Sequence, residues 1–254
     1  MSCCQSMLRK TYHIKERKFV LDYIINLAQR YYNAFFAEGR YTAYLEGIGN
    51  TLIISLFAVL LGVLLGVLVA VVKYIAKGHK NPVILVLDKL CSLYVTVVRA
   101  TPVYLQIFII ANLIFTARDM EIYAAITCFG INSGAYVSEI IRAGIESIDK
   151  GQFEAGQSLG LSSGTIMRSI ILPQAVKNIL PALGNEFITL IKETAVAGAI
   201  AVTDVTKAAQ YIGSRTWDVL PPLFIAAGIY LIIVLGLTKL LRIFERRLAA
   251  SDHH

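Results

Sequence analysis

The chain has 254 residues, of which 56% are hydrophobic and only 16% are charged. Together with a mean hydropathy of +0.64, this composition excludes an ordinary soluble domain. The formal net charge of +7 lies mainly at the chain ends and in loops, where it suits anionic lipid headgroups better than nucleic acid.

We predict a polar N-terminal segment at residues 1–42, and we expect no cleavable signal peptide because residues 1–18 contain no apolar core. Within it, residues 19–36 are too polar for a comfortable crossing of the bilayer. The polar positions are Asp22, Asn26, Gln29, Arg30 and Asn33. We therefore expect a possible amphipathic helix at the membrane interface; if this segment crossed instead, the N-terminus would change sides.

Five apolar runs come after this segment, and each is long enough to cross the hydrocarbon core, which takes roughly 20 residues of helix. They cover residues 45–72, 83–115, 122–148, 179–202 and 223–241, the last with a basic extension to 248. In lipid every backbone amide must bond within its own segment, and the alternating pattern of a membrane barrel is absent. We predict an all-α membrane protein with about five transmembrane helices, in one domain over residues 43–248, and a C-terminal tail at 249–254.

Orientation is predicted from Lys and Arg residues near span ends, which tend to stay in the cytoplasm. The basic stretches are Lys73, Lys77 and Lys80; Lys150, Arg168 and Lys177; and Lys239, Arg242, Arg246 and Arg247. They place the C-terminus and the loop at 149–173 in the cytoplasm. An odd number of spans then places the N-terminus outside, although Arg9, Lys10, Lys15, Arg17 and Lys18 make that terminus basic, against the rule.

Small and helix-breaking residues mark two further features of the spans. Gly62 and Gly66 have the small-x-x-x-small spacing of a close helix contact. Pro102 removes an amide donor and clashes with the carbonyl of Val98, so we predict a kink in the second span, where the halves of a dimer could part. A proline tolerated by packing alone is the alternative.

Ionisable groups within spans are costly and usually face a cavity or a partner, and four of those in this chain are candidates for a pathway. They are Arg99, Glu139, Lys192 and Glu193. Together they supply both charge signs near the midplane, which suits a solute that carries both, so these four are the candidate substrate pathway.

Two alternatives apply to this pathway. Arg142 lies three residues after Glu139 and four before Glu146, so pairing along one helix face would also explain Glu139. Asn185, Thr189 and Glu193 share a face of the fourth span, and such a polar stripe either lines a path or joins helices.

The segment from Glu154 to Pro173 reads EAGQSLGLSSGTIMRSIILP and lies in a polar loop between apolar runs. Residues 152–159 can form a short helix, which Gly160 ends through a left-handed turn. Ser162 can cap a second helix through Leu172, and Pro173 is expected to stop it. Two short helices at an angle would make a rigid wedge.

The spacing of this segment is Glu-Ala-small, three residues, Gly, nine residues, Ile-x-Leu-Pro, and it resembles the EAA loop of importer permeases of the ATP-binding cassette class. The resemblance extends from about residue 47 to 217 and is greatest for the branch that imports polar amino acids. Further matches are Arg99-Ala100-Thr101-Pro102, residues 135–144, Asn185-Glu186 and Lys192-Glu193-Thr194. Ala100 and Gly156 replace a usual Gly and a usual Ala.

The resemblance implies the type I importer fold, with a cytoplasmic coupling helix seated in a groove of a separate ATPase. It assigns ATPase coupling to Glu154, Ala155, Gly156, Gly160 and Pro173, with Glu154 against a basic group and the small residues allowing close approach. Residues 151–158, GQFEAGQS, miss the phosphate-binding pattern G-x-x-x-x-G-K-S because Gln157 replaces the lysine. We therefore expect ATP and Mg on the partner ATPase, with no enzymatic activity and no cofactor in this chain.

No metal site is expected, because the four cysteines, Cys3, Cys4, Cys91 and Cys128, lack a ligand spacing. The resemblance implies a multi-pass protein of a prokaryotic inner membrane whose partners are ATPase subunits, a second permease subunit, identical or related, and an extracellular or periplasmic substrate-binding protein. Three alternatives remain: a permease for another small solute, an ion-coupled transporter or channel, which would show internal repeats, and a membrane anchor or sensor.

Overall fold

The computed structural model describes the backbone of residues 2–78 and 80–250 and the side chains of residues 19–78 and 80–248. Regular structure in this part of the chain is helical. The α-helices are α1 (Ser2–Phe35), α2 (Tyr41–Ala76), α3 (Pro82–Ala100), α4 (Val103–Leu113), α5 (Glu121–Glu146), α6 (Lys150–Ser158), α7 (Ser163–Ile166), α8 (Leu172–Glu193), α9 (Val205–Thr216) and α10 (Leu220–Ala250). Short 3-10 segments occupy Ala37–Gly39 and Thr194–Ile200, and a π-helical turn occupies Met167–Ile171.

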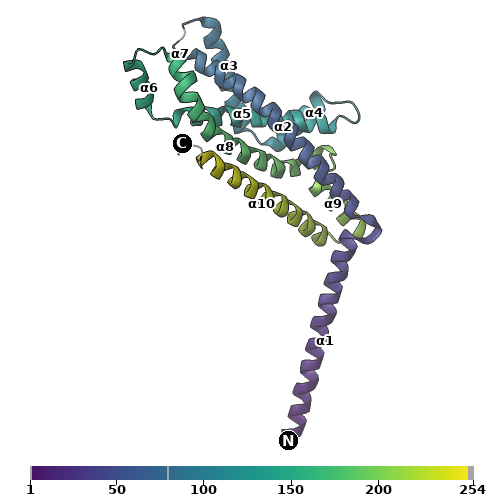
Figure 1. Ribbon diagram of the computed structural model, residues 1–254. Helices are drawn as coiled ribbons and strands as arrows, with labels where there is room; N and C mark the ends of the chain where they lie inside the picture. Colours follow the sequence, from purple (N-terminus) through teal and green to yellow (C-terminus); the bar gives the residue numbers. More distant parts are fainter. Residues whose placement is uncertain (1, 79, 251–254) are drawn as a thin grey trace.

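The long helices form an elongated bundle (Figure 1), in which α6, α7 and the C-terminal end of α10 lie at one end, and α1 and α9 at the other. Helices α2 and α5 make the most extensive contact. A Cβ on Gly62 would lie 2.7 Å from Ser133 Oγ, and one on Gly66 would lie 2.5 Å from Val137 Cγ1. The predicted close contact through these two glycines is therefore confirmed, and it fixes the register of α2 on α5.

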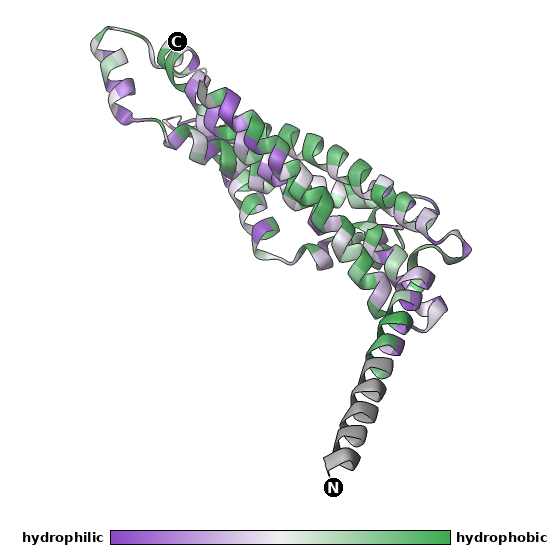
Figure 2. Ribbon diagram, turned by 60° about the horizontal axis from the view of Figure 1, so that its bottom comes forward, coloured by the Kyte–Doolittle hydropathy of each residue, from purple (hydrophilic) through white to green (hydrophobic). Residues whose placement is uncertain are grey.

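The described helices match the predicted runs unevenly. By length and composition, α2 and residues Leu220–Leu248 of α10 are long and apolar enough to cross a membrane. Helix α5 covers residues 122–146 of the run predicted at 122–148, but Glu139 and Arg142 interrupt its apolar sequence. Figure 2 shows hydrophobic residues along much of the long helices, with hydrophilic residues on α6, within the bundle and near its other end.

The second predicted span is two helices rather than one kinked helix. Thr101 is extended (φ −110°, ψ 145°) and Pro102 caps the start of α4, because a residue before proline is driven out of the helical region. The Gln106 side chain donates to the carbonyl of Val98 at 2.8 Å and to that of Thr101 at 3.0 Å. This amide replaces helical bonds lost at the break, so the interruption is stabilised.

The fourth span begins earlier than predicted, at Leu172, and Pro173 does not stop a helix. Pro173 stands in the first turn of α8, directly after the π-helical turn at Met167–Ile171. A π turn accommodates the missing amide of a proline without ending the helix. The chain from Ser163 therefore runs through α7 and this turn into α8, which ends at Glu193.

The end of the bundle that carries α9 is closely bonded. Asp204 is fully buried and accepts hydrogen bonds from the amides of Thr206 (3.0 Å) and Lys207 (2.9 Å), which caps α9. The Tyr230 hydroxyl donates to the same carboxylate at 3.0 Å. Three donors on one buried carboxylate hold α9 against α10.

Helix α1 leaves the bundle at this end (Figure 1), and its residues Phe19, Val20, Tyr23 and Ile24 are more than half exposed. The Arg30 side chain donates to both oxygens of Asp218, at 2.6 and 2.7 Å. The interfacial position predicted for residues 19–36 stays a prediction. Residues 251–254 of the expected tail, and the side chains of Cys3 and Cys4, lie outside the described residues.

Candidate functional site

The loop between α5 and α8 contains the first short helix and the left-handed turn that its sequence predicts, but the second helix continues into α8 and does not end at Leu172. The Asp149 side chain accepts from the amide of Gly151 and caps α6. Gly160 ends the turn after α6 with φ +76°, and the Leu161 amide donates to the carbonyl of Gly156 at 3.1 Å. Ser162 Oγ accepts from the amide of Thr165 at 3.2 Å and caps α7.

The coupling residues of this loop divide into an exposed group and a buried one. Glu154 and Ala155 are exposed, and Leu159, which the motif does not include, is 80% exposed. Gly156 is buried instead, and a Cβ there would lie 2.8 Å from Ile166 Cγ1. The expectation that Gly156 lets a partner approach is therefore wrong: its small size lets α6 pack on α7 within this chain.

Side-chain hydrogen bonds join the loop to the bundle. Gln152 and Gln174 bond reciprocally at 3.2 and 2.6 Å, which connects α6 to the start of α8. Asn178 donates to Ser147 Oγ at 2.9 Å, which connects α8 to the end of α5. A displacement of α6 would consequently act on both α5 and α8.

Arg99 and Glu139, two of the four predicted pathway residues, lie together between α3 and α5. Arg99 Nη1 is 3.6 Å from Glu139 Oε2, and its guanidinium lies 5.3 Å from the centre of the Tyr136 ring. A cavity of about 550 Å³ is lined by all three residues, with Lys73 and Ser92 at its side. A positively charged and a negatively charged side chain, Arg99 and Glu139, therefore line the same cavity.

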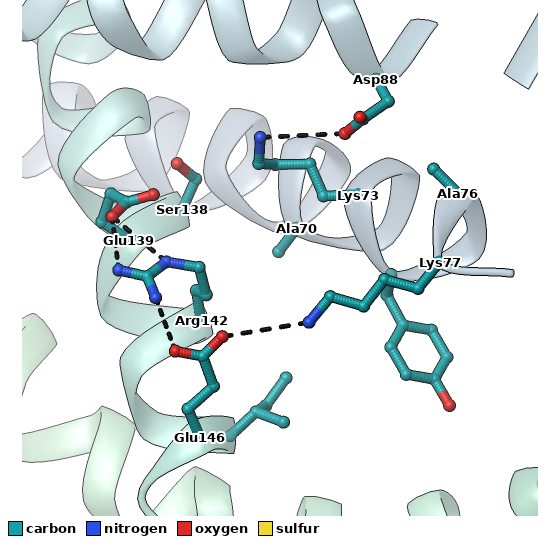
Figure 3. Close-up of a pocket in the computed structure, with 11 residues that line it drawn as sticks. Ala70, Lys73, Ala76, Lys77, Asp88, Ser138, Glu139, Arg142 and Glu146 are labelled. Carbon is teal, nitrogen blue, oxygen red and sulfur yellow. Dashed lines mark hydrogen bonds and ion pairs between the residues drawn. The ribbon is translucent and has the colours of Figure 1, made fainter. Parts of the chain in front are cut away.

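A neighbouring cavity of about 370 Å³ lies closer to α6 and is lined by α2, α3 and α5 (Figure 3). Arg142 donates to Glu139 at 2.8 Å and also bonds Glu146, so the pairing along α5 that was the alternative for Glu139 is present. Glu139 thus has one partner on its own helix and another on α3. The two explanations are compatible.

Lys192 and Glu193, the other two predicted pathway residues, lie at the end of α8 and line neither of these two cavities. Lys192 is exposed and Glu193 is half-buried. On the predicted polar stripe of α8, Asn185 is exposed and Thr189 is half-buried. The four predicted residues therefore form two separate groups in the described chain.

A polar layer inside the bundle includes a carboxylate that was not among the predicted pathway residues. Ser133 Oγ donates to Glu186 Oε1 at 2.8 Å, between α5 and α8. Asn132 donates to Gln106 Oε1 at 3.0 Å, between α5 and α4. Glu186 lies seven residues before Glu193, two helical turns away on the same face, and that spacing is the signal that would have found it.

Comparison with known proteins gives consistent matches over most of the chain. Residues 62–250 match the family described as "Binding-protein-dependent transport system inner membrane component". The putative glutamine transport system permease protein GlnP of Rickettsia typhi is 40% identical over 82% of this chain and 93% of the relative. The arginine transport system permease protein ArtQ of Bacillus subtilis is 41% identical over the same shares.

Solved structures are similar as well. An amino acid ABC transporter crystallised with histidines is 40% identical, with a TM-score of 0.75, covering 84% of this chain and 98% of that one. The methionine ABC transporter MetNI in an inward-facing conformation has a TM-score of 0.70 at 18% identity, covering 84% of this chain and 99% of that one. The second likeness concerns the fold alone.

Proposed function

The chain belongs to the family of inner membrane components of binding-protein-dependent transport systems, and from that premise we propose that it imports polar amino acids. Family membership and the solved relative confirm the predicted permease role, the membrane location and the all-α fold of type I importer permeases. The relatives named for glutamine and arginine, at 40% and 41% identity, support the substrate class. A permease for another small solute is the remaining alternative.

The exposed side of α6 is the observation that carries the coupling proposal. Glu154, Ala155 and Leu159 are exposed on a short helix that is bonded to α8 through Gln152 and Gln174. We propose that a cytoplasmic ATPase docks here, with a basic group facing Glu154 and an apolar surface covering Leu159. Gly160 and Pro173 shape the loop, and the ATPase binds ATP and Mg.

The Arg99–Glu139 cavity is our candidate for part of the substrate pathway. An amino acid presents a carboxylate and an ammonium, and this cavity offers one charge of each sign. Lys192 and Glu193 would belong to a second part of the pathway, completed by a second permease subunit, identical or related. ATP-driven closure of the ATPase pair would move α6 and open the pathway outward.

The proposed topology places the α6 end in the cytoplasm. That end carries the basic residues Lys73 and Lys77 and the C-terminal part of α10, in line with the positive-inside rule. The opposite end, with α1 and α9, would face the substrate-binding protein, and the N-terminus would lie outside. No catalytic residue is proposed in this chain.

Co-purification of the permease with its ATPase tests the coupling proposal. Glu154→Ala is expected to weaken ATPase docking by about tenfold, or roughly 1.4 kcal/mol, while membrane insertion stays intact. Glu46→Ala is the matched control, since Glu46 is an equally exposed carboxylate on α2 at the other end of the bundle. If both variants dock to the ATPase equally well, Glu154 does not belong to the interface.

A separate experiment identifies the substrate: the uptake of each of a panel of amino acids by the reconstituted complex.

A further inference from the structure

The cavity in Figure 3 has a part that the pathway residues do not account for. It measures about 370 Å³, a volume that suits a small molecule. Lys77 and Glu146 line it on opposite sides and do not line the neighbouring cavity that holds Arg99. Glu146 ends α5, three residues before the Asp149 cap of α6.

Two kinds of ion pair surround this cavity. Along α5, Arg142 donates to Glu146 Oε2 within hydrogen-bond length and so fixes that carboxylate. Between helices, Lys77 Nζ lies 3.9 Å from Glu146 Oε1 and Lys73 Nζ lies 3.8 Å from Asp88 Oδ1. Both distances are longer than a hydrogen bond, so Lys77 and Glu146 face each other without forming one.

We propose that Lys77 and Glu146 form a second, cytoplasm-side site for zwitterionic α-amino acids, next to the Arg99–Glu139 pathway, with Glu139 lining both cavities. The ligand's carboxylate accepts from the Lys77 ammonium, and the ligand's own ammonium donates to Glu146 Oε1. Each protein group then exchanges a 3.9 Å ion pair for a charge-assisted hydrogen bond, which is shorter and stronger. The site deepens the proposed function and rests on it, because only that topology places the α6 end in the cytoplasm.

The chemistry of the pair selects a zwitterion. The α-carboxylate and α-ammonium of a free amino acid carry opposite charges, so one ligand can bind Lys77 and Glu146 together. An ester would lack the anion that Lys77 needs, and an N-acetyl derivative would lack the cation that Glu146 needs. In either case one of the two charge-assisted hydrogen bonds to the ligand would not form, so the derivative would bind more weakly.

Equilibrium binding to the intact permease–ATPase complex, without the binding protein, tests the site. The probes are L-glutamine, L-glutamine methyl ester and N-acetyl-L-glutamine. L-Glutamine is expected to bind at least about tenfold more tightly than either derivative. Equal binding of the three probes, or no binding of L-glutamine at millimolar concentration, would overturn the proposal.

Variants locate the site. Lys77→Gln and Glu146→Gln are each expected to weaken L-glutamine binding by about tenfold, whereas Lys80→Gln, an exposed lysine outside the cavity, leaves binding unchanged. Binding that depends on Arg99 rather than on Lys77 would overturn the second site. If the wild-type complex takes up amino acids through the binding protein but the expected binding is not observed, only this inference is wrong. If the complex does not take up amino acids at all, the proposed function is wrong as well.

Discussion

The two ends of the bundle are held together by different kinds of polar contact. At the α9 end, buried Asp204 has three hydrogen-bond donors and Arg30 bonds Asp218 through two short contacts. At the α6 end, hydrogen bonds join α6 and the end of α5 to α8, but the ion pairs that join α2 to α3 and α5, such as Lys77 with Glu146, lie at 3.8–3.9 Å and are partly exposed. Hydrogen-bonded buried groups are costly to separate, and loose exposed pairs are not. We therefore expect motion at the α6 end and rigidity at the α9 end.

The largest expected effect is at Asp204. Asp204→Ala leaves the Tyr230 hydroxyl and two amides of α9 without their buried acceptor, so we expect a loss of about 3 kcal/mol of stability or more. Thermal unfolding of the purified protein measures it. Tyr230→Phe removes only one of the three donors and should cost about 1 kcal/mol; similar losses for the two variants would contradict the three-donor arrangement.

The break between α3 and α4 gives the next effect. Gln106→Leu removes the amide that bonds the Val98 and Thr101 carbonyls, and we expect about 2 kcal/mol of destabilisation. Asn112→Leu is the matched control in the same helix, because its amide is exposed and bonds only the Phe108 carbonyl. The difference between their unfolding temperatures is the measurement, and no difference would show that the break needs no support from Gln106.

The contact between α1 and the α9–α10 turn is expected to depend on pH. The Arg30 guanidinium holds the pKa of Asp218 below its ordinary value of 3.8. The contribution of this pair is therefore present above about pH 3.8 and is lost as the pH falls through the lower folded pKa. The distance between two spectroscopic labels, one on α1 and one on α9, should increase in acid. In Asp218→Asn the distance should already be large at neutral pH and should no longer change with pH. A wild-type distance that does not change with pH would contradict the prediction.

The smallest effect is expected at the α6 end. Lys77→Gln should change stability by less than about 0.5 kcal/mol, because exposed ion pairs contribute little and are screened by salt. Unfolding measurements at low and high salt test this directly. A loss as large as that of Asp204→Ala would show that both ends are equally rigid.

The sequence predicted the local features of the coupling loop well and its surroundings less well. Gly160 and Ser162 have their predicted roles, because a left-handed turn and a helix cap depend on a residue and its immediate neighbours. Pro173 and Gly156 do not, since the role of each depends on the helical segment beside it or packed against it. Pro173 lies after a π-helical turn, and Gly156 packs on Ile166; neither fact is visible in the spacing of the motif.

The amino-acid sequence alone determined the membrane class, the approximate positions of the apolar runs, an irregularity at Pro102 and the resemblance to a permease family, because composition and short motifs carry these properties. It predicted a kink at Pro102, whereas the chain divides there into α3 and α4. Only the packing of the helices decided which charges meet. Arg99 lies beside Glu139 and Glu186 bonds Ser133, whereas Lys192 and Glu193 lie elsewhere. The physical reason is register: Gly62 and Gly66 set how α2 lies on α5, and side chains far apart in the sequence pair only where packed helices bring them within a few ångströms.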